Sequence, residues 1–243
     1  MKTTLILAIG LFFSLVTLGQ TSEELILRAN LKHEKKDFVG AIADFSNVIE
    51  TDPLNKYVFV YRGDSKAESG DFQGAIDDYT KAIEIDDMYA LAYYYRANNK
   101  AKINDYQGAL LDYNSLIKIV PLFAMGYNNR AITQVKLKDY KSAISDFSRA
   151  LEIDKNYAMG WVLRGNARVD IRDIANAITD YNQAIIIDPE MSEAYYARGF
   201  SKILIGQNSS GCIDLKKAKE LGKVETQILI KEFCKEVKRQ DPW

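Results

Sequence analysis

Two charged residue types recur along the chain at one fixed spacing, and their pairing is the clearest chemical pattern in the sequence. The arginines lie 34 residues apart, at Arg28, Arg62, Arg96, Arg130, Arg164 and Arg198. The aspartates keep that spacing and follow 16 residues behind, at Asp44, Asp78, Asp112, Asp146, Asp180 and Asp214. A guanidinium and a carboxylate form a bidentate ion pair. Such a ladder serves either to bind acidic ligands or to hold the fold together.

The surroundings of these charges favour the structural role. Each arginine follows a large apolar residue by three positions, and each aspartate immediately precedes another, so both border an apolar seam. There an arginine can lay its aliphatic stem on apolar neighbours while its guanidinium pairs with a carboxylate. We expect each aspartate to pair with the arginine of the following unit, as Asp44 with Arg62, which would lock neighbouring units together. Pairing within one unit is the alternative.

Other residues with catalytic potential are few. His33 is the only histidine of the chain, and its neighbourhood supplies Glu34 and Asp37 but no cysteine, so we expect an exposed polar residue. The sequence contains no phosphate-binding loop, nucleophile elbow or HExxH motif. We therefore predict a non-catalytic protein with no metal and no cofactor.

The elements that position the charges must themselves repeat every 34 residues, which is the period of a helix-turn-helix unit. Small residues recur at two places: Ala29, Gly63, Ala97, Ala131, Gly165 and Gly199, and Ala41, Ala75, Ala109, Ala143, Ala177 and Gly211. Bulky residues recur at two more: Leu25, Phe59, Tyr93, Tyr127, Trp161 and Tyr195, and Phe45, Tyr79, Tyr113, Phe147, Tyr181 and Leu215. Small residues at fixed places let two antiparallel helices approach closely, so each unit is predicted to be a helical hairpin.

This pattern resembles the tetratricopeptide repeat over roughly residues 22–225. The resemblance implies an all-α, right-handed α-solenoid of six hairpins whose concave face is lined by the first helices. We place the repeats near residues 22–55, 56–89, 90–123, 124–157, 158–191 and 192–225. The last copy departs from the pattern, with Gln207-Asn208-Ser209-Ser210-Gly211 where an earlier copy has Asp71-Phe72-Gln73-Gly74-Ala75. That departure leaves the packing of the sixth hairpin open.

The two ends of the chain differ from the array. Residues 1–19 carry Lys2 and then a 14-residue apolar run, Leu5 to Leu18, interrupted by Ser14 and Thr17. This length suits a signal peptide and is short for a spanning helix, which needs about 20 apolar residues. We expect cleavage before Gln20 and export to the periplasm or the medium, with an uncleaved membrane anchor as the alternative. Residues 226–243 are predicted to form a capping helix, because a solenoid must cover its last apolar surface.

Cys212 and Cys234 are the only cysteines and flank the junction between the last repeat and the cap. An even count in an exported chain is compatible with a disulfide, whereas the alternative is two small buried residues at a helix contact. Similar arrays of exported bacterial proteins often carry such a terminal pair, which favours the disulfide. It would fasten the cap to the array.

Charge and surface pattern define the expected partner class. Without residues 1–19 the chain carries 31 basic and 33 acidic residues, a net charge of −2, so the cationic footprint of a nucleic-acid-binding protein is missing. We also expect no membrane insertion after signal cleavage. The remaining candidate is a protein or peptide ligand in the concave groove.

Helical periodicity identifies the side chains that should face this groove. They are aromatic, amide and aliphatic, a combination common at protein-binding surfaces. The predicted groove residues are Tyr57, Val60, Leu91, Tyr94, Asn98, Met125, Asn128, Met159, Asn166 and Tyr196. The predicted function is a protein-interaction scaffold of the cell envelope. The alternative is an architectural subunit of an envelope complex that uses its flanks or ends and leaves the groove unoccupied.

Overall fold

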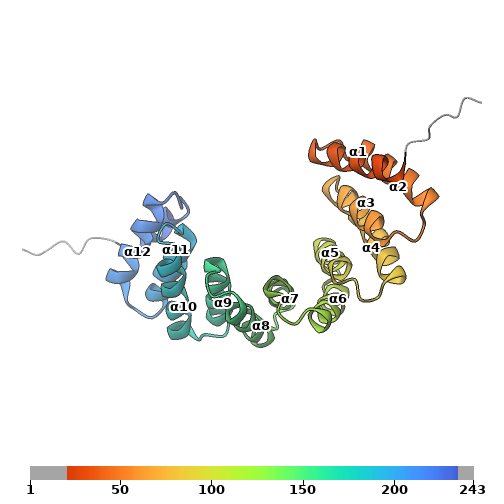
Figure 1. Cartoon of the computed structure of the whole chain (residues 1–243). Coiled ribbons are helices and arrows are strands. Elements are labelled where there is room, and N and C mark those ends of the chain that lie inside the picture. Colours follow the sequence, from red (N-terminus) through yellow and green to blue (C-terminus); the bar gives the residue numbers. More distant parts are fainter. Residues whose placement is uncertain (1–20, 235–243) are drawn as a thin grey trace, which may run out of the picture.

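Residues 21–234 are described by the computed structural model, which is helical with no strand in that range (Figure 1). The first helices of the six repeats are α1 (Ser22–Glu34), α3 (Lys56–Glu68), α5 (Ala90–Lys102), α7 (Ala124–Lys136), α9 (Ala158–Asp170) and α11 (Ser192–Leu204). The second helices are α2 (Phe38–Thr51), α4 (Phe72–Ile85), α6 (Tyr106–Ile119), α8 (Tyr140–Ile153), α10 (Ile174–Ile187) and α12 (Asn208–Glu220), and α13 (Thr226–Phe233) follows them. This order confirms the predicted all-α solenoid of six hairpins.

A left-handed residue closes the first helix of every repeat. It lies two residues beyond the helix, at Lys36, Gly70, Asn104, Lys138, Arg172 and Gly206, with φ between 62° and 91°. The next backbone N–H returns to a carbonyl of the last turn, as from Asp71 to Lys66 at 2.9 Å. This is the Schellman arrangement, in which the reversal satisfies carbonyls that the helix end leaves free. It turns the chain at once into the second helix.

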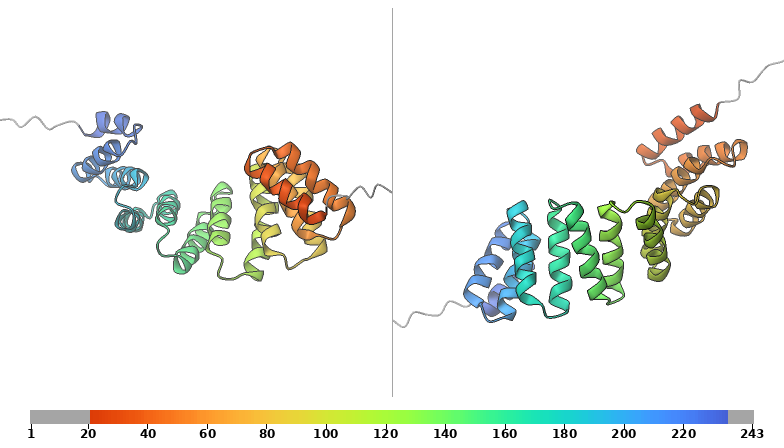
Figure 2. Two further views of the ribbon diagram at one scale, coloured as in Figure 1. Left: turned by 45° about the horizontal axis from the view of Figure 1, so that its top comes forward. Right: turned by 60° about the horizontal axis from the view of Figure 1, so that its bottom comes forward.

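The hairpins stack into a curved array (Figures 1 and 2). Each helix packs against the next, and successive first helices also contact one another, from α1 with α3 to α9 with α11. The first helices line the inner side of the arc and the second helices form its outer side (Figure 1). The inner face is therefore built from six equivalent helices.

The periodic small residues lie where the helices of a hairpin approach most closely. The alanines at both positions are fully buried, for example Ala97 and Ala109. The sixth hairpin uses glycine on both helices: a Cβ on Gly211 would lie 2.7 Å from the carbonyl oxygen of Gly199, and one on Gly199 would lie 2.9 Å from that of Gly211. Glycine at 211 in place of alanine thus permits a close backbone contact, and the irregular last copy still packs as a hairpin.

The ion-pair ladder forms within repeats, so the predicted pairing of Asp44 with Arg62 is wrong. Arg28 binds Asp44 and Arg62 binds Asp78, in each case through Nε and Nη2 at 2.5–2.8 Å. The same bidentate pair recurs in the other four repeats. The reason is local: each arginine and aspartate lie beside the small residues where their two helices approach most closely.

Contact with the preceding repeat comes instead from the third nitrogen of the guanidinium. Nη1 donates to a side-chain oxygen two positions beyond the preceding aspartate, as from Arg62 to Ser46 at 3.0 Å and from Arg96 to Thr80 at 3.1 Å. The partners of the next three arginines are Asn114, Ser148 and Asn182. One guanidinium therefore joins both helices of its own hairpin to the second helix of the hairpin before.

A second cation completes the ladder in five of the six repeats. Lys32, Lys66, Lys100, Arg168 and Lys202, each four residues after the arginine, bind the same aspartates at 2.6–2.9 Å. The fourth repeat has Gln134 instead, and its Oε1 is buried without a hydrogen-bond partner. The Asp146 side chain there keeps 10% of its surface exposed, against 1–5% for the other five aspartates.

A disulfide joins Cys212 on α12 to Cys234 at the end of α13, with 5.6 Å between the Cα atoms. This confirms the predicted bond. The capping helix is short, because α13 ends at Phe233, and it packs on α12 and α11. The rest of the predicted cap, from residue 235, and the predicted signal peptide, residues 1–19, lie outside the described residues. Within residues 21–234, no helix has both the length and the apolar character needed to span a membrane.

The fourth repeat provides a test of the ladder. We expect Gln134→Lys to raise the free energy of unfolding by up to about 1 kcal/mol, because it supplies a partner for a partly exposed ion pair. The reverse change in the third repeat, Lys100→Gln, should lower the free energy of unfolding by a similar amount. Urea denaturation followed by circular dichroism measures both. Equal stability of the two variants and the parent would show that the second cation is dispensable.

Candidate functional site

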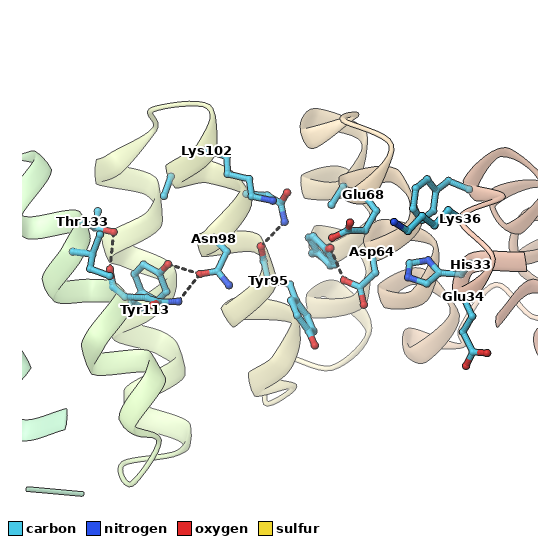
Figure 3. A pocket seen from close by; sticks show the side chains of 17 residues that line it. His33, Glu34, Lys36, Asp64, Glu68, Tyr95, Asn98, Lys102, Tyr113 and Thr133 are labelled. Atoms are coloured by element: carbon cyan, nitrogen blue, oxygen red, sulfur yellow. Dashed lines mark hydrogen bonds between the residues drawn. The ribbon is translucent and has the colours of Figure 1, made fainter. Parts of the chain in front are cut away.

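The inner face contains a cleft that runs across the first four repeats (Figure 3). Its volume is about 720 Å³, and side chains from α1, α3, α5 and α7 form its walls. The polar residues lining it include Asp64, Glu68, Asn98, Asn99 and Lys102. The cleft is therefore mixed in character, with acids, amides and lysines above an aromatic floor.

Tyrosines of the second helices form that floor. The rings of Tyr79 and Tyr113 are at most 2% exposed, and both line the cleft. Their hydroxyls donate to Asp64 Oδ1 at 2.7 Å and to Asn98 Oδ1 at 2.6 Å. Burial raises the pKa of both phenols, so they remain hydrogen-bond donors at neutral pH. Each tyrosine thus fixes a polar side chain of the neighbouring first helix.

The absence of a side chain at one glycine leaves room for the ring of Tyr79 to reach the inner face. A Cβ on Gly63 would lie 2.8 Å from the ring of Tyr79. The fifth repeat has the same arrangement, since a Cβ on Gly165 would lie 2.5 Å from the ring of Tyr181, whose hydroxyl donates to Asn166 at 2.9 Å. In these two repeats, the small residue of the first helix therefore also makes room for the tyrosine whose hydroxyl reaches the groove.

Two asparagines are left with an amide nitrogen available. Asn98 Oδ1 accepts from the Tyr113 hydroxyl and from Asn129 Nδ2 at 3.0 Å, and its own Nδ2 makes no hydrogen bond within residues 21–234. Asn166 likewise uses Oδ1 for Tyr181 and has no bond from Nδ2 in the described part of the chain. These fixed amide groups can donate to a carbonyl of a bound chain.

Asn166 lies in a second cleft of about 420 Å³ between α9 and α11. Met159, Tyr196 and Phe200 supply apolar and aromatic surface there. Lys223 reaches it from beyond α12, with Nζ 3.3 Å from Glu193 Oε1 and 5.8 Å from the centre of the Tyr196 ring. Both clefts therefore contain an asparagine held by a buried tyrosine, and both lie on the same face of the array.

The structure brings four predicted groove residues into these clefts: Asn98 in the first, and Met159, Asn166 and Tyr196 in the second. Tyr94 lies beside the first cleft, where its hydroxyl accepts from Asn129 Nδ2 at 3.3 Å. Tyr57 lines a separate hollow with Lys56 and Asp86. Leu91 and Met125 are 45% and 41% exposed and lie outside the hollows described above.

Two predicted groove residues are placed differently. Val60 and Asn128 occupy equivalent positions on α3 and α7, and both are only 2% exposed. Val60 packs in the apolar cluster of Phe59, Tyr79 and Ala92, and Asn128 leaves Oδ1 buried without a partner. The next repeat covers this position, so a side chain must be longer, as in Tyr94, to reach the surface. These two residues contribute to packing between repeats.

His33 also differs from expectation, because it is half-buried and lines the first cleft. Its Nδ1 lies 2.9 Å from Ser65 Oγ, and its ring meets Phe38 edge-on. Ser65 is fully buried, and its hydroxyl donates to the Tyr61 carbonyl at 3.0 Å. The serine oxygen therefore accepts from His33, which is the wrong polarity for an activated nucleophile. No group of three His, Cys, Asp or Glu side chains within residues 21–234 is placed to hold a metal ion.

The first cleft is also lined by three residues that were not predicted and that follow predicted groove residues by one position: Tyr95, Asn99 and Asn129. Sequence analysis also missed the tyrosine hydroxyl bonds, although a signal for them exists. Each buried tyrosine follows an Asp or Asn by 15 residues, as Tyr79 follows Asp64, whereas Phe147 follows Ile132. A polar residue therefore tends to stand where a hydroxyl needs an acceptor.

One groove carboxylate lies in an unfavourable environment. Burial, reinforced by the charge of Glu68, raises the pKa of Asp64 above its ordinary value of 3.8, and the Tyr79 hydroxyl and His33 offset this only in part. An acid with a raised folded-state pKa stabilises the fold below its unfolded pKa, and that contribution is lost as the pH rises through the folded pKa. The ionised form of Asp64 therefore works against folding at neutral pH.

We expect Asp64→Asn to be more stable than the parent at neutral pH, because an amide oxygen can still accept from Tyr79. The stability difference should grow from about pH 4 upward and level off once Asp64 is fully ionised in the parent. Urea denaturation at a series of pH values measures it. A difference that does not change with pH, or that favours the parent at neutral pH, would contradict the assignment.

Family models match two parts of the chain: residues 124–157 match the tetratricopeptide repeat, and residues 63–102 match a TPR repeat. No curated protein matches the sequence. Among solved structures, YrrB, described as a TPR protein with an unusual peptide-binding site, is 19% identical with a TM-score of 0.67, covering 77% of this chain and 97% of its own.

Two further structures share the fold. MamA from Desulfovibrio magneticus RS-1 is 18% identical with a TM-score of 0.66, covering 70% of this chain and 96% of its own. A tetratricopeptide repeat protein from Parabacteroides merdae is 22% identical with a TM-score of 0.55, covering 89% of this chain and 100% of its own. At these identities the likeness concerns the fold.

Proposed function

Because this chain is a tetratricopeptide repeat protein, and so a protein-interaction scaffold, we propose that it binds an extended peptide segment of a partner protein along its inner face. We further propose that it does so without catalysis and in the cell envelope. The observation that carries the groove assignment is the pair of asparagine amides, Asn98 and Asn166, that buried tyrosines hold in place in the two clefts.

The chemistry of the clefts suits a peptide in extended conformation. Such a ligand presents backbone N–H and carbonyl groups at regular intervals and needs fixed partners for them. Asn98 and Asn166 offer donors, while Tyr95 and Tyr196 offer aromatic surface at low entropic cost. Because the tyrosine hydroxyls already orient the asparagines, little side-chain entropy is lost when a ligand binds.

The proposed location draws support from two features. Residues 1–19 have the composition of a signal peptide. The Cys212–Cys234 disulfide belongs to a class of bond that persists in oxidising compartments.

An architectural role remains the second candidate. It draws on apolar side chains exposed on the second helices, on the outer side of the array. Leu111, Ile186 and Ile213 are each 68–70% exposed. A partner that covered them would use the outer face and leave the groove free.

The chain itself suggests a clean test of the groove. The double change Asn98→Ile with Tyr113→Phe copies the Ile132 and Phe147 pair of the fourth repeat, so it removes the amide without stranding a hydroxyl. Random peptides of about 12 residues, displayed on phage and selected on the parent, supply ligands. Fluorescence anisotropy should show affinities reduced by about fivefold or more in the variant, since the loss of one hydrogen bond is worth about 1 kcal/mol.

Asn30→Ile is the matched control for this test. It makes the same change at the same register in the first repeat, outside both clefts and opposite Phe45, which has no hydroxyl. Unchanged affinity in the double variant, or an equal loss in the control, would contradict the assignment of peptide binding to the Asn98 amide. The architectural role would then take precedence.

Export is tested on the native protein. Peptide mapping by mass spectrometry should find the mature N-terminus at Gln20 and a linked pair of peptides containing Cys212 and Cys234. The bond closes a loop with a sequence separation of 22, for which chain entropy predicts a stabilisation of about 3 kcal/mol. An intact residue 1 together with two free thiols would count against export.

A further inference from the structure

The inner face carries one charge that its structural role does not require. Six equivalent positions on the first helices hold Asn30, Asp64, Asn98, Ile132, Asn166 and Phe200. Asp64 is the acid among them, and its structural partner is the Tyr79 hydroxyl at 2.7 Å. In the third and fifth repeats the same bond ends on an amide oxygen, at Asn98 and Asn166. A neutral amide therefore satisfies the tyrosine equally well.

The charge of Asp64 is also poorly compensated. Within residues 21–234 no lysine or arginine forms an ion pair with it, and Glu68 adds a second negative charge nearby. His33 faces it from α1. Lys36 and Lys102 line the same cleft without an ion pair to Asp64, and Lys102 Nζ lies 4.9 Å from the centre of the Phe72 ring. A partly buried carboxylate without a cationic partner destabilises the fold, and a cation supplied by a ligand would stabilise it.

A second, separate acceptor lines the same cleft. Asn99 is only 4% exposed, and its Nδ2 donates to the Tyr95 carbonyl at 2.9 Å. Its Oδ1 is buried and has no hydrogen-bond partner. Buried polar atoms in folded proteins almost always have a hydrogen-bond partner. The Asn99 oxygen is an exception, a second acceptor in the cleft that has no donor. Asp64 and Asn99 together make the cleft rich in acceptors.

Aromatic rings complete these surroundings. The rings of Tyr79 and Tyr95 stack with their centres 5.8 Å apart, and both line the cleft. Asp64 on α3 and Tyr95 on α5 point toward each other across the gap between the two helices (Figure 3). An ammonium or guanidinium group is attracted by the face of an aromatic ring as well as by a carboxylate.

We propose that the first cleft is a specificity site for a lysine or arginine side chain of the bound peptide, with its charged group beside Asp64 and its alkyl stem on the ring of Tyr95, which is the less buried of the two tyrosines. This inference rests on the proposed function, since the cation arrives as part of a peptide held in the groove. The inference specifies the ligand further: the bound peptide has a basic residue at one fixed position, while its other positions are not specified.

Peptide selection tests the proposal with the complete mature chain. The probe is the same displayed library of random peptides, selected in parallel on the parent, on Asp64→Asn and on Asp170→Asn. The last is a matched control, because Asp170 lies on the same face in the second cleft. We expect the parent and Asp170→Asn to enrich lysine or arginine at one shared position, and Asp64→Asn to select peptides without that preference.

A thermodynamic cycle then locates the contact. The best peptide is compared with a copy in which its basic residue is replaced by methionine, on the parent and on Asp64→Asn. The parent should lose about tenfold in affinity, the size expected for a partly desolvated ion pair with a cation–π contact. Asp64→Asn should lose little, because the partner of the basic residue is already gone.

The outcomes separate the two proposals. Peptides selected without a conserved basic residue, or an equal loss on both proteins, would overturn the cation site and leave the groove assignment intact. Failure of the parent to select any peptide would overturn both. Should Asp64→Asn fold poorly, Glu68→Gln and the salt dependence of the parent's affinity for the two peptides serve instead. A loss that persists unchanged at high salt would then contradict the ion pair.

Discussion

The array depends on an arginine that makes three kinds of contact at once. In each repeat its Nε and Nη2 bind the aspartate of the partner helix, and from the second repeat on Nη1 reaches the preceding second helix. From the second repeat on the guanidinium also lies 4.7–5.7 Å from the centre of an aromatic ring on its own helix. A lysine could not replace it, because a single ammonium cannot present three donors in one plane. Hairpin geometry and repeat-to-repeat spacing are therefore fixed by one side chain.

Because these contacts hold the fold, the side chains of the inner face are free to differ between repeats. The ion ladder and the small-residue seam hold the helices together, so inner-face side chains vary from repeat to repeat without loss of the fold. The position of Asp64, for example, holds amide, acid, aliphatic and aromatic residues in different repeats. A repeat protein can carry a specific binding surface when the side chains of that surface differ between repeats and the packing residues stay the same.

The resemblance to the tetratricopeptide repeat supplied the inner and outer faces, and the terminal cysteine pair of similar exported arrays favoured the disulfide. Sequence periodicity alone was sufficient for the hairpins, because their pattern recurs in every copy. It failed for the ion pairs, since a spacing of 16 within a repeat and of 18 to the next are equally compatible with period 34; the distance between helix axes decides between them. It also failed for Val60 and Asn128, because the covering of their position depends on how far one repeat rotates against the next. Asn98 and Asn166 were predicted to face the groove, whereas Asn99, Asn129 and the tyrosines that hold the predicted pair were not.

Departures from the repeat carry the most functional information, and they are of two kinds. Gln134 breaks a pattern that stabilises the fold and leaves a buried oxygen without a partner, so its effect can be measured as stability. Asp64 breaks no structural pattern, because its carboxylate accepts from a buried tyrosine as Asn98 and Asn166 do in the third and fifth repeats. What it adds is charge in a cleft where Asn99 Oδ1 already lacks a donor. When six copies of one unit solve the same packing problem, a costly residue in a single copy is best explained by something outside the chain that only this copy contacts.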